Sequence, residues 1–78
     1  MNVKQATVLR FQEIMAQRSI RPNELANLSG VTPSTVYSML DERRKELSIN
    51  TIKKLCDGLK ITLGEFFSAE YLRDLQNL

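Results

Sequence analysis

Apolar and polar positions follow one another along this chain with the spacing of short amphipathic helices. In the first segment Val8, Phe11, Ile14 and Met15 recur at intervals of three and four, and polar residues stand between them. This spacing predicts a helix over residues 3–17 with one face on a core. Because no segment shows clean period-two alternation, the sequence predicts an all-α fold.

Breaks and caps predict the next two helices. Pro22 fits the first position of a short helix over residues 22–28, where its missing N–H is not needed. Gly30 is expected to end that helix in the left-handed conformation. Thr32 then caps a third helix, expected over residues 33–42, which begins with a proline.

Three further helices are expected after a charged connection. Ser48 caps the fourth, and Thr62 and Glu65 form a capping box that opens the fifth. A last turn or short helix is expected over residues 69–76. The apolar face of the fourth helix carries Ile49, Ile52, Leu55, Cys56 and Leu59.

Size and composition narrow the function classes. A chain of 78 residues is one domain that buries only about 60% of its unfolded surface, which leaves little room for an enclosed substrate cavity. Histidine is absent and Cys56 is the single cysteine, so the chain lacks the residues for a Cys/His zinc site, for Ser/His/Asp catalysis or for an intrachain disulfide. We expect no enzyme activity, cofactor, metal or small-molecule substrate.

The hydropathy of the chain bears on its location in the cell, and its charge bears on its binding partner. There is no apolar signal run and no stretch approaching the roughly 20 apolar residues of a membrane span, so a cytoplasmic protein without membrane contact is expected. Residues 1–60 hold ten basic and six acidic residues, a net +4, whereas residues 61–78 hold one and three, a net −2. A basic body with an acidic end fits a nucleic-acid binder.

The second and third helices have the residues of a helix-turn-helix. Two short helices joined by a tight turn need a small residue at their contact, which Ala26 supplies, and a positive φ at the turn, which Gly30 allows. Val31 is the apolar plug of the turn. The residues that then point inward from the third helix are Val36, Met39 and Leu40.

The opposite face of the third helix carries small polar side chains. Hydroxyl groups donate to or accept from base edges, and small side chains let a helix approach DNA closely. Tyr37 has two interpretations, a base or sugar contact and partial packing against the first helix. The expected base-contacting residues are Pro33, Ser34, Tyr37 and Ser38.

Taken together, these spacings resemble the Cro and lambda-repressor type of helix-turn-helix family, the xenobiotic-response-element-like transcriptional regulators. The resemblance spans roughly residues 8–67. It implies a compact five-helix domain, residues 33–42 as recognition helix, and a dimer on two half-sites. The matching residues are Leu25-Ala26, Gly30-Val31-Thr32, Ser34-Thr35-Val36, Ser48 to Ile52, Leu55-Cys56, Leu59, Ile61 and Leu63 to Phe67.

The expected phosphate contacts surround this helix. Pro22 stands where family members often carry glutamine, so its neighbours are expected to make that contact at a helix N-terminus. A basic loop directly after the third helix is either an ordinary solvated loop or a phosphate-contacting segment. The expected phosphate-contacting residues are Arg21, Asn23, Thr32, Thr35, Arg43, Arg44 and Lys45. Caps with a second interpretation as phosphate ligands are Ser48, Asn50 and Thr51.

The end of the chain holds more apolar surface than a thin core needs. Residues 1–67 are expected to form the DNA-binding domain, and residues 68–78 an extension that packs on the first helix or forms a dimer interface. The candidate dimer residues are Phe67, Tyr71, Leu72 and Leu75. Cys56, on the core face of the fourth helix, is interpreted as a buried thiol rather than a redox sensor.

Two functions remain open from the sequence. The first is a sequence-specific double-stranded DNA-binding regulator, a repressor, that acts as a homodimer. The alternative is a helical protein-interaction module that keeps the fold and has lost DNA binding, because fold alone does not define function. A salt-sensitive affinity for duplex DNA separates the two.

Overall fold

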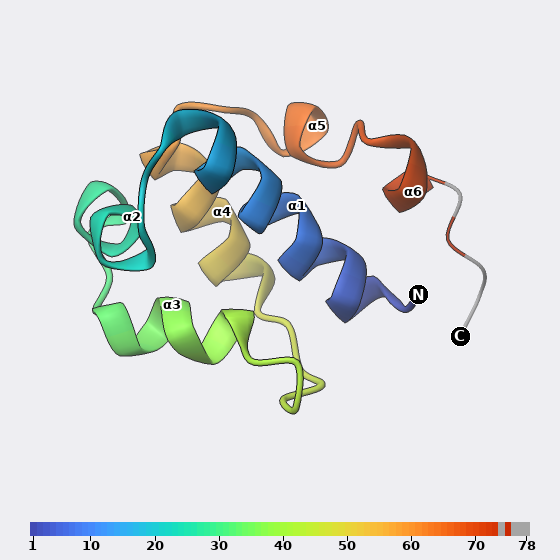
Figure 1. Ribbon diagram of the computed structural model, residues 1–78, viewed down its shortest axis with the longest axis horizontal. Helices are drawn as coiled ribbons and strands as arrows, with labels where there is room; N and C mark the ends of the chain where they lie inside the picture. Colours follow the sequence, from blue (N-terminus) through green and yellow to red (C-terminus); the bar gives the residue numbers. More distant parts are fainter. Residues whose placement is uncertain (74, 76–78) are drawn as a thin grey trace.

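The computed structural model describes residues 1–73 and 75, and this part of the chain is helical without strands (Figure 1). This confirms the expected all-α fold. Four longer helices precede two short ones of four residues each. The helices are α1 (Val3–Arg18), α2 (Pro22–Ser29), α3 (Pro33–Leu40), α4 (Ile49–Gly58), α5 (Leu63–Phe66) and α6 (Glu70–Arg73).

The caps that divide the chain lie where the sequence places them. The Thr32 side chain accepts the Thr35 N–H, and the Ser48 side chain accepts the Thr51 N–H at 3.2 Å. Thr62 opens α5 with the reciprocal bonds of a capping box. Gly30 has φ 69° and ends α2 in the left-handed region. The four corresponding predictions are confirmed.

Two expectations about helices need correction. The third helix ends at Leu40 rather than at residue 42, because Asp41 is extended with ψ 108° and its carboxylate accepts the Arg43 N–H instead of continuing the helix. Ile49 was expected on the core face, but 59% of its surface is exposed, since it begins α4 at the edge of the core beside the charged loop. Of the last expected helix, α6 covers residues 70–73, and residues 74 and 76 lie outside the described part.

One core joins the helices. Phe11 and Phe66 are fully buried with ring centroids 4.4 Å apart, so α1 and α5 meet through aromatic contact. Cys56 is buried as expected, and burial raises the pKa of its thiol to about 11. The buried residues of this core are Phe11, Ile14, Met15, Leu25, Ala26, Val36, Met39, Ile52, Leu55, Cys56, Leu59 and Phe66.

Basic side chains of α1 bind the C-terminal ends of three other helices. Lys4 donates to the carbonyl of Met39 in α3, and Arg18 donates to the carbonyl of Leu59, the C-cap of α4. The Arg10 Nε donates to the Phe66 carbonyl in α5 at 2.7 Å. Because the last carbonyls of a helix lack internal partners and carry partial negative charge, cations are favoured there. The first helix thereby fixes the ends of three others.

Helix α2 packs against both α3 and α4. The contact with α4 is close, because a Cβ added at Gly58 would lie 2.9 Å from the Leu28 backbone carbonyl carbon. Only glycine lets the two backbones approach this far. No helix within the described residues is long and apolar enough to cross a membrane.

Candidate nucleic-acid interface

The turn between α2 and α3 holds the two helices in fixed relation. Ala26 is fully buried and its carbonyl accepts the Val31 N–H at 3.1 Å, which closes the turn after Gly30. Val31 is half-buried and packs against the core. Val36 is fully buried from α3. A core contact on each side of the turn therefore determines which face of α3 is left outward.

That outward face carries the expected base-contacting residues. Pro33 and Ser34 are exposed, Ser38 is half-buried, and Tyr37 leaves 53% of its surface exposed. The side chains of Val36 and Met39 occupy the opposite, buried face. In Figure 1, α3 runs along the lower edge of the molecule.

Hydroxyl groups gather at the first turn of α3. The Thr32 Oγ1 lies 3.0 Å from the Ser34 Oγ and 2.9 Å from the Thr35 Oγ1, in addition to its capping bond. These side chains therefore fix one another at the helix N-terminus. Hydroxyl hydrogens rotate, so the same groups remain able to donate to an approaching oxygen.

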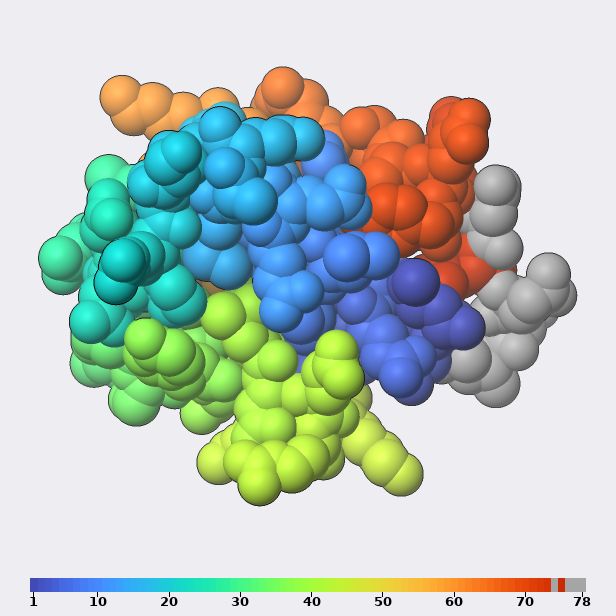
Figure 2. Space-filling view, in the orientation of Figure 1, coloured from blue at the N-terminus to red at the C-terminus, as the bar shows by residue number. Residues whose placement is uncertain are grey.

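A hollow of about 630 Å³ lies between α3, the following loop and the start of α4. It brings the two expected base-contacting serines together with part of the expected phosphate-contacting loop. In Figure 2 the yellow-green segment after α3 projects from the lower edge of the molecule. The residues that line the hollow are Ser34, Thr35, Ser38, Met39, Arg44, Lys45, Glu46, Ser48 and Thr51.

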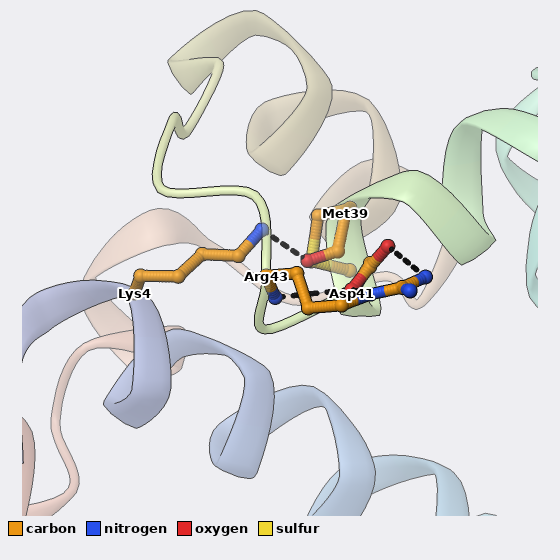
Figure 3. A network of polar contacts seen from close by, with 4 residues as sticks. All are labelled: Lys4, Met39, Asp41 and Arg43. Atoms are coloured by element: carbon orange, nitrogen blue, oxygen red, sulfur yellow. Dashed lines mark hydrogen bonds and ion pairs between the residues drawn. The ribbon is translucent and has the colours of Figure 1, made fainter.

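The first arginine of the loop is held by an acidic neighbour (Figure 3). The Arg43 Nε donates to the Asp41 Oδ1 and its Nη2 to the Oδ2, both at 3.0 Å. These bonds and the Arg43 backbone N–H lower the pKa of Asp41 to about 2. The Arg43 guanidinium thus has an ionised partner, whereas Arg44 and Lys45 line the hollow.

Lys4 joins the same network from α1. Its Nζ donates to the Met39 carbonyl, one residue before the end of α3 (Figure 3). Burial lowers the pKa of Lys4, and the nearby Asp41 carboxylate opposes that shift. The end of α3, and with it the start of the loop, is therefore fixed by the first helix.

Other predicted site residues lie apart from the hollow. Arg21 and Asn23 are exposed at the start of α2 and do not line it. At the other end of the chain, Phe67 is half-buried and packs edge-on against Phe66, and the Tyr71 hydroxyl donates to the Glu13 carboxylate. Leu72 and Leu75 are also half-buried.

Sequence reasoning missed the ion pair and two residues of the hollow. The Asp41–Arg43 fork joins residues two apart, at a helix end that the sequence analysis placed two residues too late. Met39 and Glu46 line the hollow, but Met39 was assigned only to the core and Glu46 only to a charged connection. The signal in the sequence is Asp41 itself, because an aspartate at a helix end can accept the backbone N–H two residues on, here that of Arg43.

The geometry is that of a helix-turn-helix domain, with α2 and α3 as its two helices. A family model described as the Cro/C1-type HTH DNA-binding domain matches residues 10–70. The chain belongs to this family, which confirms the expected resemblance and implies DNA binding. Domains of this family are typically non-enzymatic.

A solved structure supports the fold independently. The chain is similar to the crystal structure of the prophage Lp1 protein 11, with a TM-score of 0.80 and 29% sequence identity. The match covers 92% of this chain and 95% of that chain. No curated protein matches the sequence.

Proposed function

We propose that the chain is a sequence-specific transcriptional regulator, a repressor, that inserts α3 into the major groove of double-stranded DNA as a homodimer. One observation carries this proposal. Two outward serines of α3, Ser34 and Ser38, line the same hollow as the loop cations Arg44 and Lys45. Base contacts specify sequence and phosphate contacts fix register, so a working interface needs both kinds of group on one surface.

The outward face of α3 is suited to reading base edges. Hydroxyls both donate and accept, and short side chains allow the helix to lie deep in the groove. Tyr37 adds an exposed ring beside them. We assign base contacts to Pro33, Ser34, Tyr37 and Ser38.

The hollow is suited to one strand of the sugar-phosphate backbone. Arg44 and Lys45 supply charge, and the start of α4 supplies free backbone N–H groups beside Ser48 and Thr51. A second set of phosphate contacts is assigned to the N-terminal ends of α2 and α3. Its residues are Arg21, Asn23, Thr32 and Thr35, and Arg43 contributes only when it leaves Asp41.

The proposed dimer surface lies at the end of the chain, in an extension over residues 68–78 that follows a DNA-binding domain over residues 1–67. Phe67 and Tyr71 already have partners within the chain, Phe66 and Glu13. The remaining apolar surface therefore comes from Leu72 and Leu75, which are half-buried in the single chain.

Selection of bound duplexes from a random pool tests this function. We expect an enriched two-fold symmetric sequence whose half-sites lie about 10 base pairs apart, which reports a dimer. Ser34→Ala and Ser38→Ala should change which bases are selected. Gln12→Ala, which changes an exposed polar residue of α1, should not. The absence of any enriched sequence contradicts sequence-specific binding, and a single half-site contradicts the dimer.

A further inference from the structure

We propose that Asp41 competes with DNA phosphates for Arg43 and so limits the affinity of the chain for DNA of unrelated sequence. The inference rests on the proposed DNA-binding function and assigns to Asp41 a part in setting the affinity for DNA. Its basis is the ion pair of Figure 3, which lies directly after α3.

The geometry of the pair is that of a guanidinium binding an oxyanion. Two parallel N–H donors of Arg43 meet the two oxygens of Asp41, each at 3.0 Å. Carboxylate and phosphate bind a guanidinium in this same forked manner. Asp41 therefore occupies the donors that a DNA phosphate would use.

The Asp41 carboxylate is itself held in place. Its Oδ1 also accepts the Arg43 backbone N–H at 3.0 Å, and its side chain is only 24% exposed although that of Arg43 is 91% exposed. The partners are two residues apart, so little chain entropy is lost when they meet. The fork is thus a local structure of the free protein, within direct reach of solvent and of DNA.

The neighbouring cations do not share this restraint. Arg44 and Lys45 line the hollow, and neither is in an ion pair within the described residues. Glu42 is next to Asp41, is exposed, and likewise forms no ion pair in that part of the chain. The loop therefore offers one restrained arginine, two unrestrained cations, and a carboxylate that serves as a matched control.

A restrained arginine lowers the affinity for all duplex DNA without touching a base. Binding to unrelated DNA depends almost wholly on phosphate contacts, whereas operator binding adds base contacts from α3. Removing one phosphate contact lowers both affinities by about the same factor, so the ratio of operator binding to unrelated binding stays the same. Because unrelated sites greatly outnumber operators, the weaker phosphate binding mainly raises the fraction of protein that is free of unrelated DNA.

Four variants, with Arg44→Gln for comparison, test the inference by titration of an unrelated duplex over a range of salt concentrations. Asp41→Asn keeps an oxygen for the Arg43 N–H and removes the charge. We expect it to bind about three- to fivefold more tightly, with a log–log salt slope steeper by about 0.9, the value for one added phosphate contact. Arg43→Gln alone should change affinity by less than about twofold, because Arg43 is already engaged. In the double variant Asp41→Asn/Arg43→Gln, the gain in affinity seen with Asp41→Asn should disappear. Glu42→Gln should leave the salt slope unchanged.

The possible outcomes distinguish a failure of this inference from a failure of the proposed DNA-binding function. If Arg43→Gln costs as much as Arg44→Gln, Arg43 already contacts phosphate and the inference is wrong while DNA binding stands. A gain from Asp41→Asn that persists without Arg43, or that Glu42→Gln reproduces, reports general charge and also overturns it. If no variant binds duplex DNA with a salt dependence, the proposed function fails and the inference falls with it.

Discussion

Three basic residues of α1 contribute to the fold through hydrogen bonds to other helices. Lys4, Arg10 and Arg18 each donate to carbonyls at a helix end. Arg10 also lies over the Phe66 ring at 5.9 Å. The chain has eleven Lys and Arg residues, but these three and the paired Arg43 already have donors engaged within the protein, so fewer than eleven have all their donors free for phosphate. Net charge is therefore a poor guide to this interface.

Tyr71 gives a prediction at the scale of one side chain. Burial, followed by its hydrogen bond to Glu13, raises the pKa of Tyr71 from 10.0 to about 12. Since the folded pKa is raised, its contribution to stability is fully present below pH 10 and is lost as the pH rises through about 12. Titration of tyrosinate absorbance should show this late transition, and Tyr71→Phe should remove it. An ordinary transition near 10.0 for Tyr71 would contradict its contact with α1.

Local hydrogen bonds at single residues are well predicted from sequence, and distant ones are not. Thr32, Ser48 and the Thr62–Glu65 box follow from residue type and a spacing of three. The bond from Lys4 to Met39 joins residues 35 positions apart and depends on how α1 crosses α3. The order of polar and apolar residues along the chain does not predict how α1 crosses α3.

At the scale of elements, the contact between α2 and α4 sets the depth of the helix-turn-helix against the core. Gly58 allows it, because the backbone of α2 at Leu28 and Ser29 occupies the space of a Cβ. The sequence alone gave no reason for a glycine within the fourth helix, where alanine is intrinsically favoured. Its reason is the close approach of a second backbone.

Gly58→Ala should therefore destabilise the protein despite its better helix propensity. We expect a loss of about 1–3 kcal/mol in the free energy of unfolding, because α2 and α4 must move apart. Gly64→Ala is the matched control, since its added Cβ would meet only the Thr62 hydroxyl, at 3.7 Å. That control should be neutral or gain up to about 1 kcal/mol. Urea unfolding of both variants measures the difference, and equal effects would argue against the close contact.

The sequence predicted which segments are helical better than it predicted where each helix ends. Periodicity and caps located α1 to α5, but the end of α3 depended on whether Asp41 continued the helix or bonded to Arg43. That choice decides how the loop leaves α3, and so which cations line the hollow. Element ends are governed by such competing hydrogen bonds.

At the scale of the whole molecule, polar and basic residues from positions 34 to 51 of the sequence lie on one surface. The recognition helix, the loop and the start of α4 meet at the hollow because α2 and α4 pack together and α1 fixes the end of α3. The sequence predicted the base-facing serines and the basic loop as separate features. It did not predict that they share a surface with the start of α4, since this depends on the packing of α4 against α2.

The central claim is that this surface holds duplex DNA, and the salt dependence of binding tests it most directly. Arg44→Gln should weaken binding to all duplexes alike and make the log–log salt slope shallower by about 0.9. Lys60→Gln removes an equal charge just after the C-cap of α4, at the opposite end of that helix from the hollow, and should leave the slope unchanged. Equal slopes for the wild type and Arg44→Gln, or an equal change in Lys60→Gln, would contradict the account.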